Sequence, residues 1–399
     1  MRATPPILIT TAKLTSSTVA EPHVPSAYNA GTTYALGEIA SVAADFSVYE
    51  SLAGSNTGNT PNSSPLWWRQ IGYVETAYNA GTTYAIGDTC SANHRVYQSL
   101  TAGNTGNTLP VLPEITTTHW LDIGPTMRYA MFDLSRNTQT VGPSPLTVVV
   151  TPGERVNTVG LTGMAGNSLL IKATSVSAGG IIYPLAYIST KTYNKGDCMT
   201  VGFATCYKCL IDDTVGITAP NATYWAVVSG AIFDLNTREV FDAYTYYYEP
   251  FSTRPTKTAF DIPPVSDVIV TVTLTAPAGN CKIGGLTLGT NIYLGKLLKP
   301  ASNTGISFST VSRDMYGSTA LVKRKMLRKI SGTLLLDGFR VDKVLDAREL
   351  LDAEPALYTG VDEDGDWTGA MTIVGVHQQF DIGTSPGNEA LIPFSAEEI

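Results

Sequence analysis

Aromatic side chains are the residues of this chain whose types and spacing best suit a chemical role, and that role is non-covalent. Trp67 directly precedes Trp68, and adjacent residues of a strand point to opposite faces. The two indoles cannot enter one core together, so we expect Trp68 inside and Trp67 exposed. An exposed flat ring offers the CH-rich face of a sugar a large, rigid contact. Trp67 is therefore the first candidate for carbohydrate stacking, with Tyr73 and Tyr78 as lesser candidates.

The other aromatics have a simpler interpretation, the hydrophobic core. A unit of roughly 50 residues without a disulfide buries little apolar surface, so a few large rings must supply most of its core. The alternative, that some tyrosines stay exposed for stacking, is open at this point, although burial is the commoner role. We interpret the following residues as module core: Tyr34, Tyr49, Trp68, Tyr84, Tyr97, Trp120, Tyr193, Tyr207 and Trp225.

A tandem repeat must position these rings. Residues 27–35 recur letter for letter as 77–85, a displacement of 50 residues. Each copy continues with Tyr-x-x-Gly and an acid, a short apolar run ending in Tyr, a polar loop, a Pro and Trp-x-x-Ile-Gly. Short aromatic runs separated by Gly, Asn and Pro predict strands joined by tight turns. We therefore predict two β-modules of about three strands each, at 26–72 and 73–124.

This pattern resembles the small chitin- and cellulose-binding modules of carbohydrate-binding families five and twelve. The similarity rests on Tyr-x-x-Gly-Asp/Glu, Tyr-x-Ser-Leu, Pro and Trp in that order, and it covers residues 26–124. Such modules are appended to glycosidases and also occur in tandem near the N-terminus of bacteriophage tail proteins. The resemblance implies a module type, and it implies a host-surface glycan as the candidate ligand.

Residues 125–186 and 230–304 have a different sequence pattern from the modules. Alternating β-branched runs such as Leu146–Thr151 are broken by turn residues, which predicts an antiparallel sandwich. A looser resemblance, carried by the run Arg128–Asp133, is to the galactose-binding-like jelly roll of phage tail proteins. The preceding residues 1–25 are strand-prone but have no core of their own. This N-terminal arm must pack on a neighbouring domain or on another subunit to be ordered.

A third, diverged module is predicted within the sandwich. Tyr193 opens another Tyr-x-x-Gly-Asp signature, and Tyr207, Pro220 and Trp225 follow at intervals close to those of the first copy. Domain insertions are tolerated in surface loops. We therefore interpret residues 187–229 as a module inserted into a sandwich loop.

The remaining residues, 305–399, are predicted to form a β-rich (α+β) domain with one helix at Val341–Ala353, where apolar residues have helical spacing. Val322–Ile330 carries the densest positive charge. The simpler interpretation of this basic segment is a strand exposed to solvent, and the alternative is a contact with an acidic partner or DNA. Asp362–Asp366 resembles the start of a calcium loop, but its glycine is misplaced for such a loop. A hairpin turn explains it better.

Composition and charge argue against several functions. Only 15% of the 399 residues are charged and the net charge is −8, whereas a nucleic-acid binder shows a basic balance. No long apolar run and no signal-peptide core occur, so we expect no membrane span and synthesis in the host cytoplasm. Cys206-x-x-Cys209 has no second pair at zinc spacing, which favours reduced thiols. No catalytic motif is recognisable, so neither an enzymatic activity nor a cofactor is expected.

Two classes of function follow from these observations. The first is a mainly β component of the virion, in the tail tip or baseplate of a bacteriophage. In that role the chain would contact other tail proteins and further copies of itself, and its modules would project toward host-surface glycans. The second is a carbohydrate-binding accessory protein of a polysaccharide-degrading system. The lack of a signal peptide and of a catalytic domain favours the first.

Overall fold

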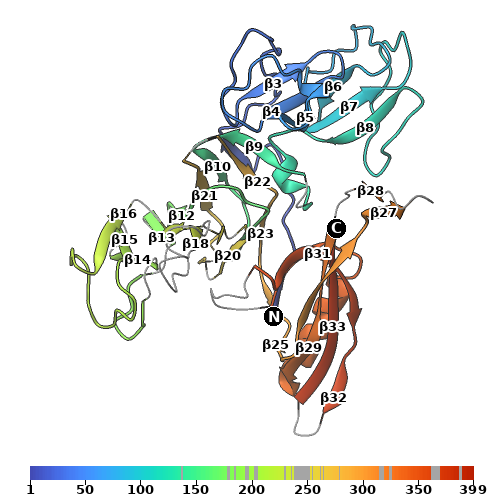
Figure 1. Cartoon of the computed structure of the whole chain (residues 1–399). Coiled ribbons are helices and arrows are strands. Elements are labelled where there is room, and N and C mark those ends of the chain that lie inside the picture. The colour runs from blue at the N-terminus through green and yellow to red at the C-terminus, as the bar shows by residue number, and fades with distance from the viewer. Residues whose placement is uncertain are drawn as a thin grey trace.

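Antiparallel β-sheets dominate the computed structural model of this chain (Figure 1). The basic residues Lys323–Lys325, the acidic loop Asp362–Asp366 and the side chain of Cys206 lie outside the described part. The structure describes residues 1–399 except 136–137, 178–179, 184–185, 194–196, 202–204, 229–230, 235, 238–251, 254, 261, 264, 278, 314–318, 323–325, 361–368 and 386–388.

Three small antiparallel sheets lie at 39–73, 89–125 and 198–228, and we call these units modules 1, 2 and 3. Each sheet has three strands, and its middle strand pairs with both neighbours. In modules 1 and 2 the last strand runs one residue beyond the boundary expected from the sequence. The strands are β3 (Ile39–Val42), β4 (Ser47–Ser51) and β5 (Trp68–Tyr73); β6 (Thr89–Ala92), β7 (Arg95–Ser99) and β8 (Trp120–Pro125); and β14 (Cys198–Val201), β15 (Thr205–Cys209) and β16 (Trp225–Val228), with a short helix η1 (Pro61–Ser63) in module 1.

The Tyr-x-x-Gly-acid signature builds the turn before the first strand of a module. Gly37 has a φ of +85° and Gly87 a φ of +91°, a left-handed region that favours glycine. The following carboxylate folds back on the turn, because Glu38 Oε2 accepts a 2.7 Å hydrogen bond from the backbone N–H of Ala35, and module 2 repeats this bond. A Cβ on Gly37 would lie 2.4 Å from the Cα of Gly279, so glycine also lets module 1 approach the sandwich closely.

The sandwich has one large sheet and several short pairings around a single core. Alternate residues of β21 (Val268–Thr275) are buried, so one face of this strand points inward. Val148 and Leu169 from the large sheet share the core with Leu161 and Leu288 from a smaller sheet. The large sheet has the order β13-β12-β21-β10-β2 with β17 beside β12, and the smaller pairings are β20-β11-β23 and β22-β9. The bounds are β2 (Leu14–Ser17), β9 (Thr140–Pro143), β10 (Leu146–Val150), β11 (Thr158–Thr162), β12 (Ser168–Ser175), β13 (Gly180–Tyr183), β17 (Ala231–Asp234), β20 (Lys257–Ala259), β22 (Asn280–Ile283) and β23 (Gly285–Gly289); η2 (Ala130–Phe132), β18 (Asn236–Thr237) and β19 (Ser252–Thr253) complete this part.

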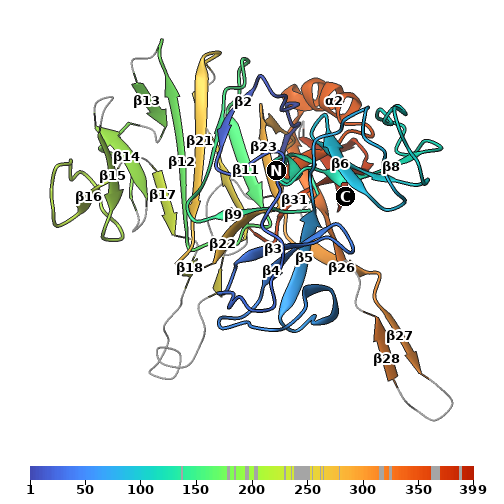
Figure 2. The same cartoon turned by 90° about the horizontal axis from the view of Figure 1, so that it is seen from above.

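Module 3 leaves and re-enters the sandwich at one strand. The preceding strand β13 pairs with the second half of β12, and the following strand β17 pairs with its first half. The segments that connect module 3 to the sandwich therefore both lie along one edge of β12, and the module projects from that edge (Figures 1 and 2). This arrangement lets the large sheet stay continuous across the insertion.

The C-terminal part is a nine-stranded sheet with the helix α2 (Val341–Leu350). Val344 and Ala347 of α2 pack into the same core as Tyr358 and Phe394 of the sheet. The sheet order is β24-β1-β30-β31-β33-β29-β25, with β26 beside β29 and β32 beside β33. The bounds are β1 (Arg2–Thr4), β24 (Ile292–Tyr293), β25 (Lys296–Leu297), β26 (Ser302–Ser307), β29 (Met326–Asp337), β30 (Ala356–Thr359), β31 (Thr372–Phe380), β32 (Gly383–Ser385) and β33 (Glu389–Glu398); a hairpin of β27 (Thr310–Arg313) and β28 (Thr319–Val322) and a short helix η3 (Gly338–Arg340) lie between β26 and α2.

The N-terminal arm joins the two large domains of its own chain. Its first strand, β1, pairs with both β24 and β30 of the C-terminal sheet, and β2 pairs with β10 of the sandwich. The C-terminal sheet also begins earlier than the predicted boundary at 304, because β24 and β25 already belong to it. The arm thus packs on neighbouring domains, which is one of the two outcomes expected from the sequence. The boundary differs because β24 and β25 have two residues each and carry too little sequence pattern to reveal their sheet.

Candidate functional site

Each module core is built around one arrangement of two tyrosines and a tryptophan. In module 1 the ring of Tyr28 stacks on Tyr34 at a centroid distance of 5.7 Å, and Tyr34 meets Trp68 edge-on at 4.9 Å. The same geometry recurs with Tyr78, Tyr84 and Trp120 in module 2 and with Tyr187, Tyr193 and Trp225 in module 3. The nine aromatics expected in the cores are all buried.

Most polar atoms of these rings are hydrogen-bonded inside the modules, although the buried hydroxyls of Tyr28 and Tyr187 have no partner among the described residues. The indole N–H of Trp68 donates to the backbone oxygen of Asn59 at 2.8 Å, and Trp120 and Trp225 make equivalent bonds. The hydroxyl of Tyr34 accepts a 2.8 Å hydrogen bond from the backbone N–H of Asn29. Rings held on both faces and at their polar edge have no free surface for a ligand.

Tyr78 belongs to this core instead of to a free aromatic face. Its ring stacks on Tyr84 at 6.0 Å, and its hydroxyl donates to the backbone oxygen of Asn107 at 2.9 Å. Tyr28 and Tyr187 hold the same place in modules 1 and 3. The sequence signal for this position is an Ala-Tyr pair, which occurs in all three modules at 27–28, 77–78 and 186–187.

The residue directly before the core tryptophan is a ring in all three modules: Trp67, His119 and Tyr224. Its backbone oxygen accepts an N–H from a leucine of the neighbouring segment at 2.9, 2.9 and 2.8 Å respectively, which establishes that the three positions are equivalent. Trp67 keeps 37% of its surface exposed beside the buried Trp68. Sequence reasoning missed Tyr224, although its place before Trp225 in the diverged copy marks it.

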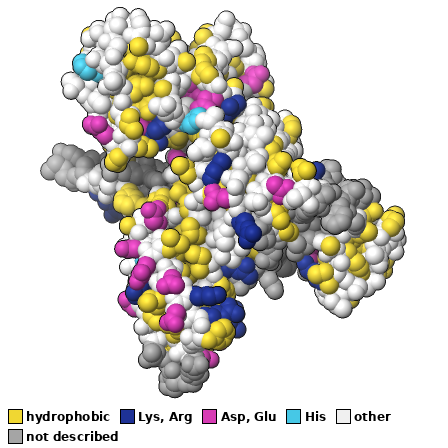
Figure 3. Space-filling view, turned by 180° about the vertical axis from the view of Figure 1, so that it is seen from behind, with side chains coloured by type: hydrophobic (Ala, Val, Ile, Leu, Met, Phe, Trp, Pro, Cys, Tyr) yellow, Lys and Arg dark blue, Asp and Glu magenta, His cyan; other side chains and the backbone are white. Residues whose placement is uncertain are grey.

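The leucine that makes this bond is itself exposed in each module. Leu52, Leu100 and Leu210 keep 39%, 40% and 37% of their surface accessible. We call each ring with its leucine the ring–leucine face: Trp67 with Leu52, His119 with Leu100, and Tyr224 with Leu210. Figure 3 shows hydrophobic side chains on the outer surfaces of the modules. A flat ring beside branched methyl groups is the kind of surface on which the apolar face of a sugar can rest.

Tyr73 lies at the junction of modules 1 and 2 with the sandwich. It is half-buried and lines a pocket of about 290 Å³. The Ile-Gly endings of the two repeats, at 71–72 and 123–124, line the same pocket. The shared Trp-x-x-Ile-Gly ending therefore places its tryptophan in a module core and its Ile-Gly at the junction.

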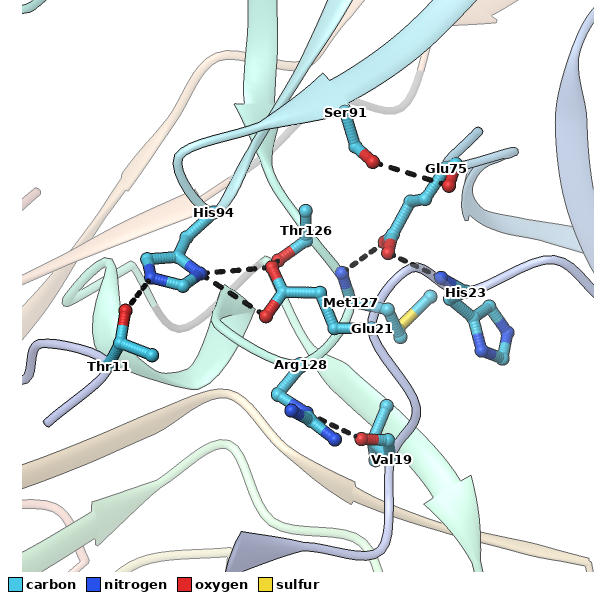
Figure 4. Close-up of polar contacts among 10 residues, drawn as sticks. All are labelled: Thr11, Val19, Glu21, His23, Glu75, Ser91, His94, Thr126, Met127 and Arg128. Carbon is cyan, nitrogen blue, oxygen red and sulfur yellow. Dashed lines mark hydrogen bonds and ion pairs between the residues drawn. The ribbon is translucent and has the colours of Figure 1, made fainter. Parts of the chain in front are cut away.

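A buried carboxyl group, Glu75, ties the start of module 2 to the arm and the sandwich (Figure 4). Its two oxygens accept the backbone N–H groups of His23, at 2.7 Å, and of Met127. Ser91 donates to its backbone oxygen at 3.2 Å. Burial raises the pKa of Glu75 to about 7, although the two N–H groups favour the charged form. This junction is thus sensitive to protonation near neutral pH.

A second acid, Glu21 of the arm, holds module 2 from the other side (Figure 4). Its Oε1 accepts hydrogen bonds from Thr126 at 2.6 Å and from Nδ1 of His94 at 3.1 Å. The other ring nitrogen of His94 lies 2.7 Å from the hydroxyl of Thr11. The imidazole also stacks on Tyr129 with centroids 3.7 Å apart. His94 therefore connects module 2 with the arm and with the start of the sandwich.

Module 1 is attached through a different carboxylate, Glu50. This buried group accepts from Lys282 of the sandwich at 2.7 Å and from Arg69 of its own module at 2.6 Å. Asn280 donates to the backbone oxygen of Gly37 beside it. Because the pair of Glu50 with Lys282 is charge-assisted and largely buried, it fixes the orientation of module 1 on the sandwich.

The described part of the chain contains no cluster of three His, Cys, Asp or Glu residues that could hold a metal ion. Cys209 is a buried free thiol. No helix within the described ranges is long and apolar enough to cross a membrane. Comparison with known proteins finds no matching family model, no similar curated protein and no similar solved structure.

Proposed function

We propose that this chain is a structural component of a bacteriophage tail, in the tail tip or baseplate, and that its modules bind glycans of the host surface. The sequence resemblance of the modules supports the phage setting. We take the sandwich to be a jelly roll that carries the modules. The C-terminal sheet would assemble with other tail proteins and with further copies of the chain.

The observation that carries the binding proposal is the recurrence of the ring–leucine face. The modules differ at many positions, yet the position before each core tryptophan holds Trp67, His119 or Tyr224, and a half-exposed leucine accompanies each. Trp67 does not belong to the core of module 1, whereas Tyr224 is partly buried and also packs against the core of module 3. Recognition of a ligand does require an accessible ring.

Single faces of this kind bind weakly. A stacked ring contributes about 1–2 kcal/mol, so a lone module would hold a sugar only at millimolar affinity. Three faces on one chain, multiplied by the copies in a tail, raise the effective concentration of the second and later contacts. Useful adsorption would therefore depend on avidity.

Adsorption of phage particles to host cells tests this proposal. Virions carrying Trp67→Ala together with Tyr224→Ala should assemble normally but adsorb at least tenfold more slowly. Ile86→Ala is the matched control, because Ile86 is an exposed apolar residue of module 2 that is not part of a ring–leucine face. Unchanged adsorption by assembled double-variant particles would leave the modules without a receptor role.

The location of the chain is tested separately. Antibody fragments against module 1 should label one end of the tail in electron micrographs of purified particles. If the chain were absent from purified particles, the proposal of a tail component would fail even if the modules bound glycans.

A further inference from the structure

The hairpin β27–β28 projects from the C-terminal domain without support from the described body. β26 still pairs with β29 along its whole length, but β27 and β28 pair only with each other, over four residue pairs. Figure 2 shows the hairpin extending beyond the rest of the molecule. A two-stranded hairpin alone is marginally stable in water.

The side chains of this hairpin are unusually apolar for an exposed element. Every residue of β27 is exposed, and Val311 keeps 63% of its surface accessible. Val322 at the end of β28 is also exposed, as are Phe308 just before β27 and Met326 at the start of β29. Exposed apolar side chains and unpaired strand edges together mark a surface for contact with another protein.

The net charge of the segment that contains the hairpin indicates which kind of partner it would bind. Residues 302–330 contain six basic residues and one acidic residue, so their formal charge is +5. The whole chain carries −8, which leaves −13 on the remainder. The rest of a second copy therefore carries a net charge of the opposite sign, which favours a second copy as the partner.

One surface of the chain combines acidic groups, which would attract the basic segment, with apolar groups that could pack against the apolar side chains of the hairpin. On α2, Asp342, Leu345, Asp346 and Glu349 have the spacing i, i+3, i+4, i+7 and are all exposed on one side of the helix. Just before α2, Phe339 keeps 76% of its surface accessible. Residues 337–354 contain six acidic and three basic residues. We call this surface the α2 face.

We propose that the β27–β28 hairpin of one copy packs on the α2 face of the next copy. Figure 2 shows the hairpin projecting away from α2, so the hairpin of one chain does not reach its own α2 face. Contact between two different surfaces is a head-to-tail contact, which closes into a ring or continues as a filament. This inference specifies the self-assembly part of the proposed function and does not depend on glycan binding.

Light scattering on the purified full chain tests the contact. The hairpin variant carries Val311→Asp with Arg313→Glu, and the face variant carries Asp346→Arg with Glu349→Arg. We expect the wild type to be oligomeric and each variant to be monomeric at the same concentration, with unchanged melting temperature. Arg155→Glu, a charge reversal at an exposed site on the sandwich, is the control and should behave as wild type.

Mixing the two variants identifies the pair of surfaces. The hairpin variant keeps its α2 face and the face variant keeps its hairpin, so a 1:1 mixture should form one junction and stop at a dimer. A monomeric wild type, or oligomers that survive either pair of substitutions, would overturn the proposal. A mixture that stays monomeric would show that the hairpin does not bind the α2 face.

Discussion

Modules 1 and 2 share their cores and their Ile-Gly endings, but they differ in the polar residues that attach them to the rest of the molecule. Both begin with the same nine-residue segment and bury the same aromatic arrangement. Residues at equivalent positions differ, however: Glu50 of module 1 corresponds to Gln98 of module 2, Phe46 to His94, and Trp67 to His119. Phe46 and His94 both have positive φ values, of 53° and 65°, so the turn is the same and only its side chain differs.

This comparison separates the residues that make the module from those that attach it. Module 1 uses Glu50 to bind Lys282, and module 2 uses His94 and Glu75 to bind the arm and the sandwich. A substitution in the shared aromatic core should therefore unfold whichever module carries it. A substitution at an attachment residue should affect one module and spare the other.

The largest effect is expected from the core tryptophans. Trp68→Ala and Trp120→Ala should each cost about 3–5 kcal/mol, because the buried indole also loses its hydrogen bond. That cost is enough to unfold a domain of this size. Hydrogen exchange resolved by peptide should show loss of protection in the altered module alone. Equal loss in both modules would mean that they do not have separate cores.

The next effect concerns pH and distinguishes module 2. The folded pKa of Glu75, about 7, lies above its ordinary value of 4.5, so its contribution is fully present below pH 4.5 and is lost as the pH rises through 7. Burial is the main cause, Glu21 adds to it, and Arg128 opposes it. The loss should be on the order of 2–3 kcal/mol.

Exchange rates of residues 73–130 at pH 5 and pH 8 measure this effect. Burial lowers the pKa of the neighbouring His23, and that group opposes Glu75 by losing stability as the pH falls. The informative quantity is therefore the difference between wild type and Glu75→Gln, which should have a flatter profile. If both proteins showed the same pH dependence, Glu75 would not be the responsible group.

A smaller effect is expected at the attachment of module 1. Lys282→Met removes one of the two cations beside the buried Glu50 and should loosen module 1 by about 2 kcal/mol. Adding Glu50→Gln, which copies Gln98 of module 2, should recover part of this loss because no buried charge is left. Small-angle scattering would report the displaced module. A double variant no better than Lys282→Met would contradict the role assigned to this ion pair.

Much of the module structure could be predicted from the sequence because aromatic residues at fixed spacing dominate such small cores. The repeat located Tyr34, Trp68 and their counterparts, and the diverged copy kept enough of the spacing to place Trp225. The spacing also implied that Trp67 is exposed beside Trp68, and the structure has this arrangement.

The contacts between distant segments could not be predicted in this way. The partner strands of β1 begin at residues 292 and 356, and the partner strand of β2 begins at residue 146. Pairs such as Glu50 with Lys282 involve single residues without a local pattern. Tyr78 was placed on a free face because its role in the core depends on a loop residue, Asn107, far along the chain. Long-range register and junction geometry are properties of the folded chain alone.

Binding of the purified chain to immobilised host-surface glycan tests the central claim that the ring before each core tryptophan recognises sugar. Single substitutions Trp67→Ala, Tyr224→Ala and His119→Ala should each leave the chain folded, although Tyr224→Ala also removes packing against the core of module 3. They should weaken retention in that order, by about 1–2 kcal/mol at most per ring, because the area and polarizability of the ring decrease from Trp to Tyr to His. Equal retention by the wild type and all three variants, with each variant folded, would contradict the account.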